Sequence, residues 1–147
     1  MVKQFLHSTA VAFETDAGPA GVMILGKSGA GKSELALELI SLGAQLVADD
    51  QTELRRDGNI IRLFTPPALR GLIELRGLGI LTLDYVDSVA LAVAVDLDVA
   101  ETARLPERHV RSFLGLDIPC LHYCESRVFA IGLKHYVVSQ HWLNKEV

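Results

Sequence analysis

The sequence predicts an α/β protein built around a parallel strand–helix–strand unit. A short apolar run, residues 21–25, precedes a glycine-rich loop, and residues 33–42 then carry leucines at helical spacing. A second apolar run, residues 44–48, follows that helix. A strand, a helix and a second strand in this order form a right-handed parallel crossover, in which ligands bind at the carboxyl ends of the strands.

The first fifty residues divide into predicted elements at turn residues. Residues 5–13 predict a strand, and residues 14–21 predict a loop because they combine aspartate, glycine and proline. Residues 21–25 are uniformly apolar, as in a strand buried on both faces. The helix over residues 33–42 is expected to end at Gly43, a residue type suited to helix C-termini.

The rest of the chain gives weaker signals. Residues 52–64 predict a hairpin because an Asp-Gly pair separates two alternating segments. Residues 89–95 predict a third buried strand, and residues 106–114 predict a helix. The tail, residues 128–143, is ambiguous between helix and strand.

Composition limits the kind of protein. The 147 residues contain no repeat or linker, so we expect one domain over residues 1–147. Half of the residues are apolar, and the net charge of −4 argues against a protein that coats nucleic acid. The longest apolar run is too short to span a membrane, and residues 1–13 lack the features of a signal peptide. We therefore expect a cytoplasmic protein that binds neither membrane nor nucleic acid.

The glycine-rich loop fits the Walker A pattern at every fixed position. Glycines let the backbone curl so that its N–H groups face phosphate oxygens, and the following helix adds its positive end. Lys32 would reach the outer phosphates, and the Ser33 hydroxyl would bind Mg²⁺. Because a buried strand precedes the loop and an amphipathic helix follows it, the sequence predicts nucleotide binding. The predicted nucleotide-binding residues are Gly26, Lys27, Ser28, Gly29, Ala30, Gly31, Lys32 and Ser33.

Two strand ends compete for the second acidic group that P-loop enzymes carry near the metal. Residues 46–50 end in Asp49 and Asp50, and residues 91–96 end in Asp96. Spacing alone leaves both open. For Asp98 we favour a solvated loop acid or a helix cap.

Two cysteines, Cys120 and Cys124, flank His122. The trio could be half of a metal site, but no second Cys/His pair follows at zinc-finger spacing. Two reduced thiols are the favoured interpretation.

Three blocks of the sequence resemble one known family. Residues 26–50 look like its P-loop, helix and acidic strand end. Residues 73–81, IELRGLGIL, resemble its signature through Glu74, Arg76 and two glycines, and His7 resembles the histidine that precedes its P-loop strand. The family is that of the HPr kinase/phosphorylases, bacterial protein-serine kinases.

Members of this family transfer the γ-phosphoryl group of ATP to a serine of HPr, a small carrier protein of the sugar phosphotransferase system. Their nucleotide core is similar to that of phosphoenolpyruvate carboxykinase. The resemblance implies that Asp50 accepts the serine proton, that Asp49 assists, and that Glu74 joins Ser33 on Mg²⁺. It also implies catalytic roles for Lys32, His7 and Arg104, and a supporting role for Arg76.

The resemblance is to a short form of the family. The core begins almost at Met1, and residues 117–132 keep little of a proline-, glycine- and arginine-rich segment associated with phosphorolysis. Kinase activity on HPr or an HPr-like protein, with a role in regulating carbon metabolism, is therefore expected rather than phosphorylase activity. A homo-oligomer is suggested without a fixed size.

Two other functions stay open. One is a P-loop kinase acting on a small metabolite, which would need a closed acceptor pocket. Residues 73–81 look instead like a mobile loop that could admit a protein. The other is a non-catalytic nucleotide-binding regulator, which could dispense with a base such as Asp50.

Overall fold

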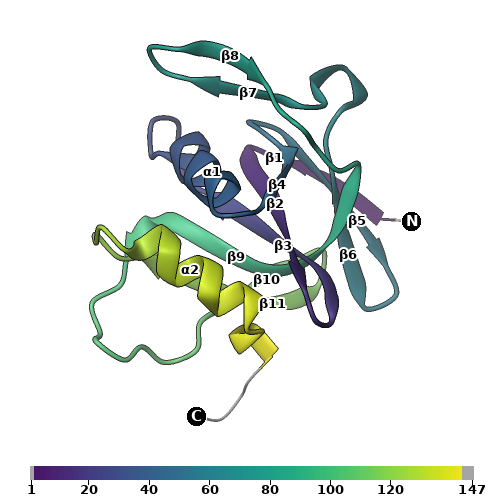
Figure 1. Ribbon diagram of the computed structural model, residues 1–147. Coiled ribbons are helices and arrows are strands. Elements are labelled where there is room, and N and C mark those ends of the chain that lie inside the picture. The colour runs from purple at the N-terminus through teal and green to yellow at the C-terminus, as the bar shows by residue number, and fades with distance from the viewer. Residues whose placement is uncertain (1, 144–147) are drawn as a thin grey trace.

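The computed structural model describes residues 2–143, and Figure 1 shows a curved β-sheet with two helices lying side by side across one of its faces. The strands are β1 (Val2–Leu6), β2 (Ser8–Thr15), β3 (Gly18–Leu25), β4 (Gln45–Ala48), β5 (Thr52–Asp57), β6 (Ile60–Phe64), β7 (Leu72–Leu75), β8 (Gly79–Thr82), β9 (Ser88–Ala100), β10 (Val110–Phe113) and β11 (Leu116–Tyr123). The helices are α1 (Lys32–Ser41) and α2 (Phe129–Val138), with short 3-10 turns η1 (Pro67–Leu69) and η2 (His141–Leu143).

Within residues 2–143, nine strands form one mixed sheet in the order β1-β5-β6-β9-β3-β2-β4, with β11 beside β9 and β10 beside β11. The long strand β9 is the centre of this arrangement. Its residues 88–90 pair with β6 in the antiparallel sense, and its residues 91–96 pair with β3 in the parallel sense. The remaining two strands, β7 and β8, form a separate hairpin that projects from the body of the molecule (Figure 1).

The parallel unit β3–α1–β4 is present, as the sequence predicts, but β2 lies between its two strands. Strand β2 is antiparallel to both β3 and β4, so the sheet is mixed rather than parallel. The loop predicted over residues 14–21 is wrong, because Thr15 already pairs with Gly18 in a tight hairpin. Asp16 and Ala17 alone reverse the chain, and the Thr15 hydroxyl accepts a hydrogen bond from the Ala17 N–H.

The structure overturns two further sequence predictions and resolves one that was left open. The helix over residues 106–114 is wrong, since Val110–Phe113 is strand β10 and turns back at Leu114 and Gly115 to pair with β11. Both turn residues have left-handed backbone angles, φ 50° and 84°, which a helix cannot contain. Residues 73–81 form the β7–β8 hairpin rather than a loop, and the ambiguous tail contains α2.

Other predictions agree with the structure. Helix α1 is shifted by one residue toward the N-terminus from its predicted bounds. The hairpin predicted over residues 52–64 is formed by β5 and β6. The strand over residues 5–13 is also present, but it is broken at His7 into β1 and β2. No helix among the described residues is long and apolar enough to cross a membrane.

The two faces of the sheet bury separate apolar cores. Helices α1 and α2 cover one face through Leu35, Leu39 and Leu133, which pack against residues of β2, β3 and β9. The opposite face is enclosed by the sheet itself, because β5, β6, β10 and β11 contribute to its core together with β2, β3 and β4. Burial of β3 on both faces explains its uniformly apolar sequence.

Gly21 provides a test of the close contact between β3 and β9. A Cβ atom at Gly21 would lie 2.7 Å from both the Ala90 carbonyl oxygen and Val89 Cγ1, which is too close for either contact. The substitution Gly21→Ala should therefore lower the free energy of unfolding by about 1–3 kcal/mol. In contrast, Gly132 lies inside α2, where a Cβ atom would meet no neighbouring atom within 4 Å, and Gly132→Ala should raise stability by about 0.5–1 kcal/mol. Urea unfolding measures both, and equal stabilities of the two variants would contradict this packing.

Candidate active site

Four parts of the chain meet at a cleft of about 390 Å³. They are the junction of β1 and β2, the loop between β3 and α1, the end of β4, and the β7–β8 hairpin. This cleft brings together most of the site residues that the sequence predicts. The lining residues are His7, Ser28, Gly29, Gly31, Lys32, Ser33, Glu34, Asp49, Asp50, Glu74 and Arg76.

The glycine-rich loop wraps around the side chain of Lys32. Its Nζ donates hydrogen bonds to the carbonyl oxygens of Gly26 at 2.7 Å and Lys27 at 3.0 Å. Gly29 and Gly31 have φ values of 85° and 102°, a left-handed conformation that side chains other than glycine rarely adopt. The loop therefore needs glycine at both positions to curl around the ammonium group.

The buried carboxylate of Asp49 accepts hydrogen bonds from three segments. Its Oδ1 accepts from the Ser33 hydroxyl at 2.7 Å and from the Thr9 hydroxyl at 3.0 Å, and its Oδ2 accepts from the Glu74 backbone N–H at 3.0 Å. The end of β4 is thereby joined to α1, β2 and β7. Thr9 was missed by sequence analysis, because a threonine in a strand carries no signal of its own.

Asp50, the next residue, also lines the cleft but is exposed there. Its Oδ1 lies 2.7 Å from His7 Nε2, and both side chains are largely exposed. Asp50 has a left-handed φ of 70°, and the Gln51 N–H donates to the Asp49 carbonyl oxygen across it at 2.8 Å. A turn of this kind is rare and costs about 1–3 kcal/mol.

The rival strand end, at β9, binds the other side of the glycine-rich loop. Asp98 is exposed, as expected, but it lies in strand β9 rather than in a loop or at a helix end, and it accepts hydrogen bonds from the Lys27 N–H at 2.9 and 3.1 Å. Asp96 accepts from Arg111 at 3.0 Å and from the Asp98 N–H at 2.9 Å. These two acids line a neighbouring cavity of about 370 Å³ with Gly26 and Lys27.

Arg104 is the predicted catalytic residue that the structure does not bring to the cleft. It is exposed in the segment between β9 and β10, where it lines a different cavity together with residues of α2 such as Tyr136. The reason is that β9 continues to Ala100, beyond the apolar run that marked it in the sequence. The segment that carries Arg104 follows this longer strand and lines the cavity beside α2.

The fold and the site define an α/β protein with a mixed sheet, a glycine-rich loop before its first helix, and an acidic cleft at the ends of its strands. The chain belongs to the family described as the HPr Serine kinase C-terminal domain, whose family model matches residues 7–100.

Individual relatives agree with this assignment. The HPr kinase/phosphorylase of Caldanaerobacter subterraneus subsp. tengcongensis is 40% identical over 112 residues, which are 74% of this chain and 36% of the relative. The HPr kinase/phosphorylase of Nitrosomonas europaea is 59% identical over 64 residues, 43% of this chain and 20% of that protein. The chain thus spans about a third or less of the curated relatives it matches.

A solved structure has the same fold over nearly the whole chain. It is the Hpr(Ser) kinase/phosphatase from Coxiella burnetii, with a TM-score of 0.76 and 23% identity. The match covers 94% of this chain and 96% of that one. The fold likeness therefore extends past residue 100, where the match to the family model ends.

The hydrogen bonds of Asp49 predict a large difference between the two neighbouring aspartates. Asp49→Ala leaves the Thr9 and Ser33 hydroxyls without their acceptor, so it should lower the free energy of unfolding by about 2–4 kcal/mol. Asp50→Asn should change it by less than about 0.5 kcal/mol, because the side chain is exposed and asparagine tolerates a positive φ. Denaturant unfolding measures both values, and similar losses would show that Asp49 does not hold the site together.

Proposed function

We propose that the chain is the P-loop core of an ATP-dependent protein-serine kinase, similar to the phosphoenolpyruvate carboxykinase-like kinases, whose substrate is HPr or an HPr-like phosphocarrier protein. The observation that carries the proposal is the placement of two different carboxylates in one cleft. Asp49 is buried and accepts a hydrogen bond from the Ser33 hydroxyl, whereas Asp50 is exposed and hydrogen-bonded to His7. The buried Asp49 carboxylate beside a hydroxyl suits the binding of a metal ion, and the exposed Asp50 carboxylate suits the acceptance of a proton.

The glycine-rich loop suits the phosphates of ATP. Lys32 already lies within the loop, bonded to two of its carbonyl oxygens. A phosphate chain offers the ammonium group stronger, charge-assisted partners than neutral carbonyls do. Residues 26–33 would then supply backbone N–H groups, the Lys32 charge and the start of α1 to the same phosphates.

The donor set around Ser33 fits Mg²⁺. The Ser33 hydroxyl is bonded to the Asp49 carboxylate, and the Glu74 side chain lines the same cleft. These are the hard oxygen donors that Mg²⁺ prefers. When bound, Mg²⁺ would neutralise charge on the phosphate oxygens during transfer. Asp49 orients the Ser33 hydroxyl and thereby prepares this position.

The acceptor side suits a protein rather than a small metabolite. The Asp50 side chain is 77% exposed and that of His7 is 51% exposed, so a serine on the surface of another protein can reach them. As the serine oxygen bonds to the γ-phosphorus of ATP, the bond from that phosphorus to the β–γ bridging oxygen would break and ADP would leave, while the serine proton would pass to the Asp50 carboxylate. The hydrogen bond to His7 keeps that carboxylate turned toward the acceptor.

The β7–β8 hairpin adds a surface that a protein could cover. Leu78 and Ile80 are 72% and 65% exposed there, and Arg76 of the same hairpin lines the cleft. Neither Arg104 nor phosphorylase activity enters the proposal. A homo-oligomer remains a prediction from resemblance alone.

The proposal is tested with radiolabelled ATP, Mg²⁺ and the HPr-like protein of the same organism. Asp50→Asn keeps the size of the side chain but cannot accept a proton, so transfer to serine should fall by about 10²–10⁴-fold. ATP binding should be retained, because Lys32 and the loop amides are unchanged. Asp96→Asn is the matched control, since Asp96 lies outside the cleft on the rival strand end.

Three results would contradict the proposal. An active Asp50→Asn with an inactive Asp96→Asn would move the chemistry to β9. Transfer of label to a panel of small metabolites but not to HPr would favour a metabolite kinase. Tight ATP binding without any turnover would favour a nucleotide-binding regulator.

A second prediction concerns the metal. Glu74→Gln should raise the Mg²⁺ concentration needed for half-maximal transfer by about tenfold or more, because it removes a charged oxygen donor from the cleft. Glu34→Gln is the matched control, since Glu34 lines the same cleft from α1 but is not a proposed ligand. A Mg²⁺ titration of each variant gives the result, and equal curves for Glu74→Gln and the unmodified protein would exclude Glu74 from the metal.

A further inference from the structure

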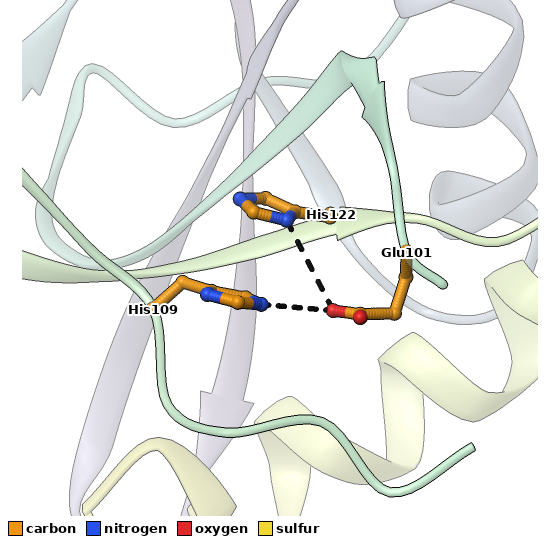
Figure 2. A group of neighbouring side chains, drawn as sticks. All are labelled: Glu101, His109 and His122. Atoms are coloured by element: carbon orange, nitrogen blue, oxygen red, sulfur yellow. Dashed lines mark hydrogen bonds and ion pairs between the residues drawn. The ribbon is translucent and has the colours of Figure 1, made fainter. Parts of the chain in front are cut away.

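A second group of chemically active side chains lies away from the cleft. Figure 2 shows the carboxylate of Glu101 directed at the imidazole rings of His109 and His122. Glu101 Oε1 lies 2.9 Å from His109 Nε2 and 3.9 Å from His122 Nδ1. The three ligand atoms all lie within 4.8 Å of one another, and the side chains are half-buried.

The backbone brings these residues together through an irregularity between β9 and β11. His122 pairs with Asp96, but the next residue, Tyr123, pairs with Ala100, so β9 contains extra residues at this point. The Glu101 N–H then donates to the Tyr123 carbonyl oxygen at 2.8 Å. On the other side of β11, the His109 carbonyl oxygen accepts from the Cys120 N–H at 2.9 Å. Irregularities of this kind often redirect side chains at functional sites.

The Glu101 carboxylate is held in place from behind. Its Oε2 accepts hydrogen bonds from the backbone N–H groups of Thr102 and Ala103, both at 3.1 Å, which leaves Oε1 for the two rings. The Ala103 N–H and then His109 hold the pKa of this carboxyl below its ordinary value. Backbone hydrogen bonds that fix a carboxylate in this way are typical of the surroundings of metal ligands.

The two rings can both reach a common ion. They are stacked, with centroids 3.9 Å apart and an angle of 12° between their planes. The torsion between Cβ and a histidine ring has a broad energy minimum. Either ring can therefore rotate at little energetic cost and direct a nitrogen atom toward an ion placed between the two histidines and Glu101. Ligands at about 2.0–2.2 Å from a tetrahedral ion lie about 3.4 Å from one another, which is within the range of separations here.

We propose that Glu101, His109 and His122 bind a divalent transition-metal ion, with Zn²⁺ as the best match. Two imidazoles and one carboxylate suit zinc far better than Mg²⁺, which prefers oxygen donors alone. All three side chains line a cavity of about 450 Å³, which Tyr136 and Cys124 also line, so the site is open to a metal ion and water. Bound metal would join the segment between β9 and β10 to β11, independently of the proposed kinase chemistry.

The test is titration of the tag-free full chain with Zn²⁺ alone, followed by calorimetry. Glu101→Gln and His109→Ala should each weaken the tightest binding by about 100-fold or more, with the loss of one zinc per chain. His135→Ala is the matched control, because His135 is an exposed histidine on α2 outside the cluster. It should leave the affinity unchanged. Asp49→Asn controls for zinc held by carboxylates of the cleft.

Two further measurements keep the test decisive if a variant folds poorly. Zn²⁺ should raise the melting temperature of the unmodified chain but not that of Glu101→Gln, which keeps the shape of the carboxylate and can still accept from Thr102 and Ala103. Co²⁺ in place of zinc should give visible d–d bands without a thiolate charge-transfer band. The proposal is overturned by equal zinc affinities of Glu101→Gln and the unmodified chain, or by a thiolate band that disappears in Cys124→Ser.

Discussion

One buried carboxylate joins three of the segments that form the candidate active site. Asp49 is removed from water, and a carboxylate in that position is costly unless hydrogen-bond donors compensate it. Three donors do so, from Ser33, Thr9 and Glu74. These donors belong to α1, β2 and β7. The hydrogen bonds that stabilise the Asp49 carboxylate therefore also hold the first turn of α1, strand β2 and strand β7 in fixed positions relative to one another.

The sequence predicted the elements that depend on local pattern. The glycine-rich loop, α1 and the β5–β6 hairpin each contain their own evidence, in helical leucine spacing or in a glycine at the turn. The strand that it missed, and the strand position that it did not predict, depend on distant partners. Val110–Phe113 becomes a strand because β11 lies beside it, and the strand β2 separates β3 from β4 although nothing in its own residues states that position.

The candidate site shows the same division between local and distant information. Sequence and resemblance named Asp49, Asp50 and Glu74, which line one cleft in the structure, but they did not predict the different surroundings of the two aspartates. Asp49 is bonded to Thr9, Ser33 and Glu74, and Asp50 is bonded to His7, and these partners come from distant parts of the chain that spacing cannot bring together. Arg104 was assigned by resemblance, but β9 is longer than its apolar run. His122 was noted only between two cysteines, since the irregular pairing that brings Glu101 to it cannot be read from spacing.

The central place of β9 also has a consequence for how the chain folds. The hairpin β2–β3 and the helix α1 can form from nearby residues, but the second neighbour of β3 is β9, whose paired residues end at Asp96. During synthesis, the strand that carries the glycine-rich loop therefore waits with one edge unpaired until β9 has left the ribosome. Sheets that join distant segments fold slowly, and their unpaired edges are prone to associate with other chains. The edge of β3 is thus the surface that a chaperone would protect on the nascent protein.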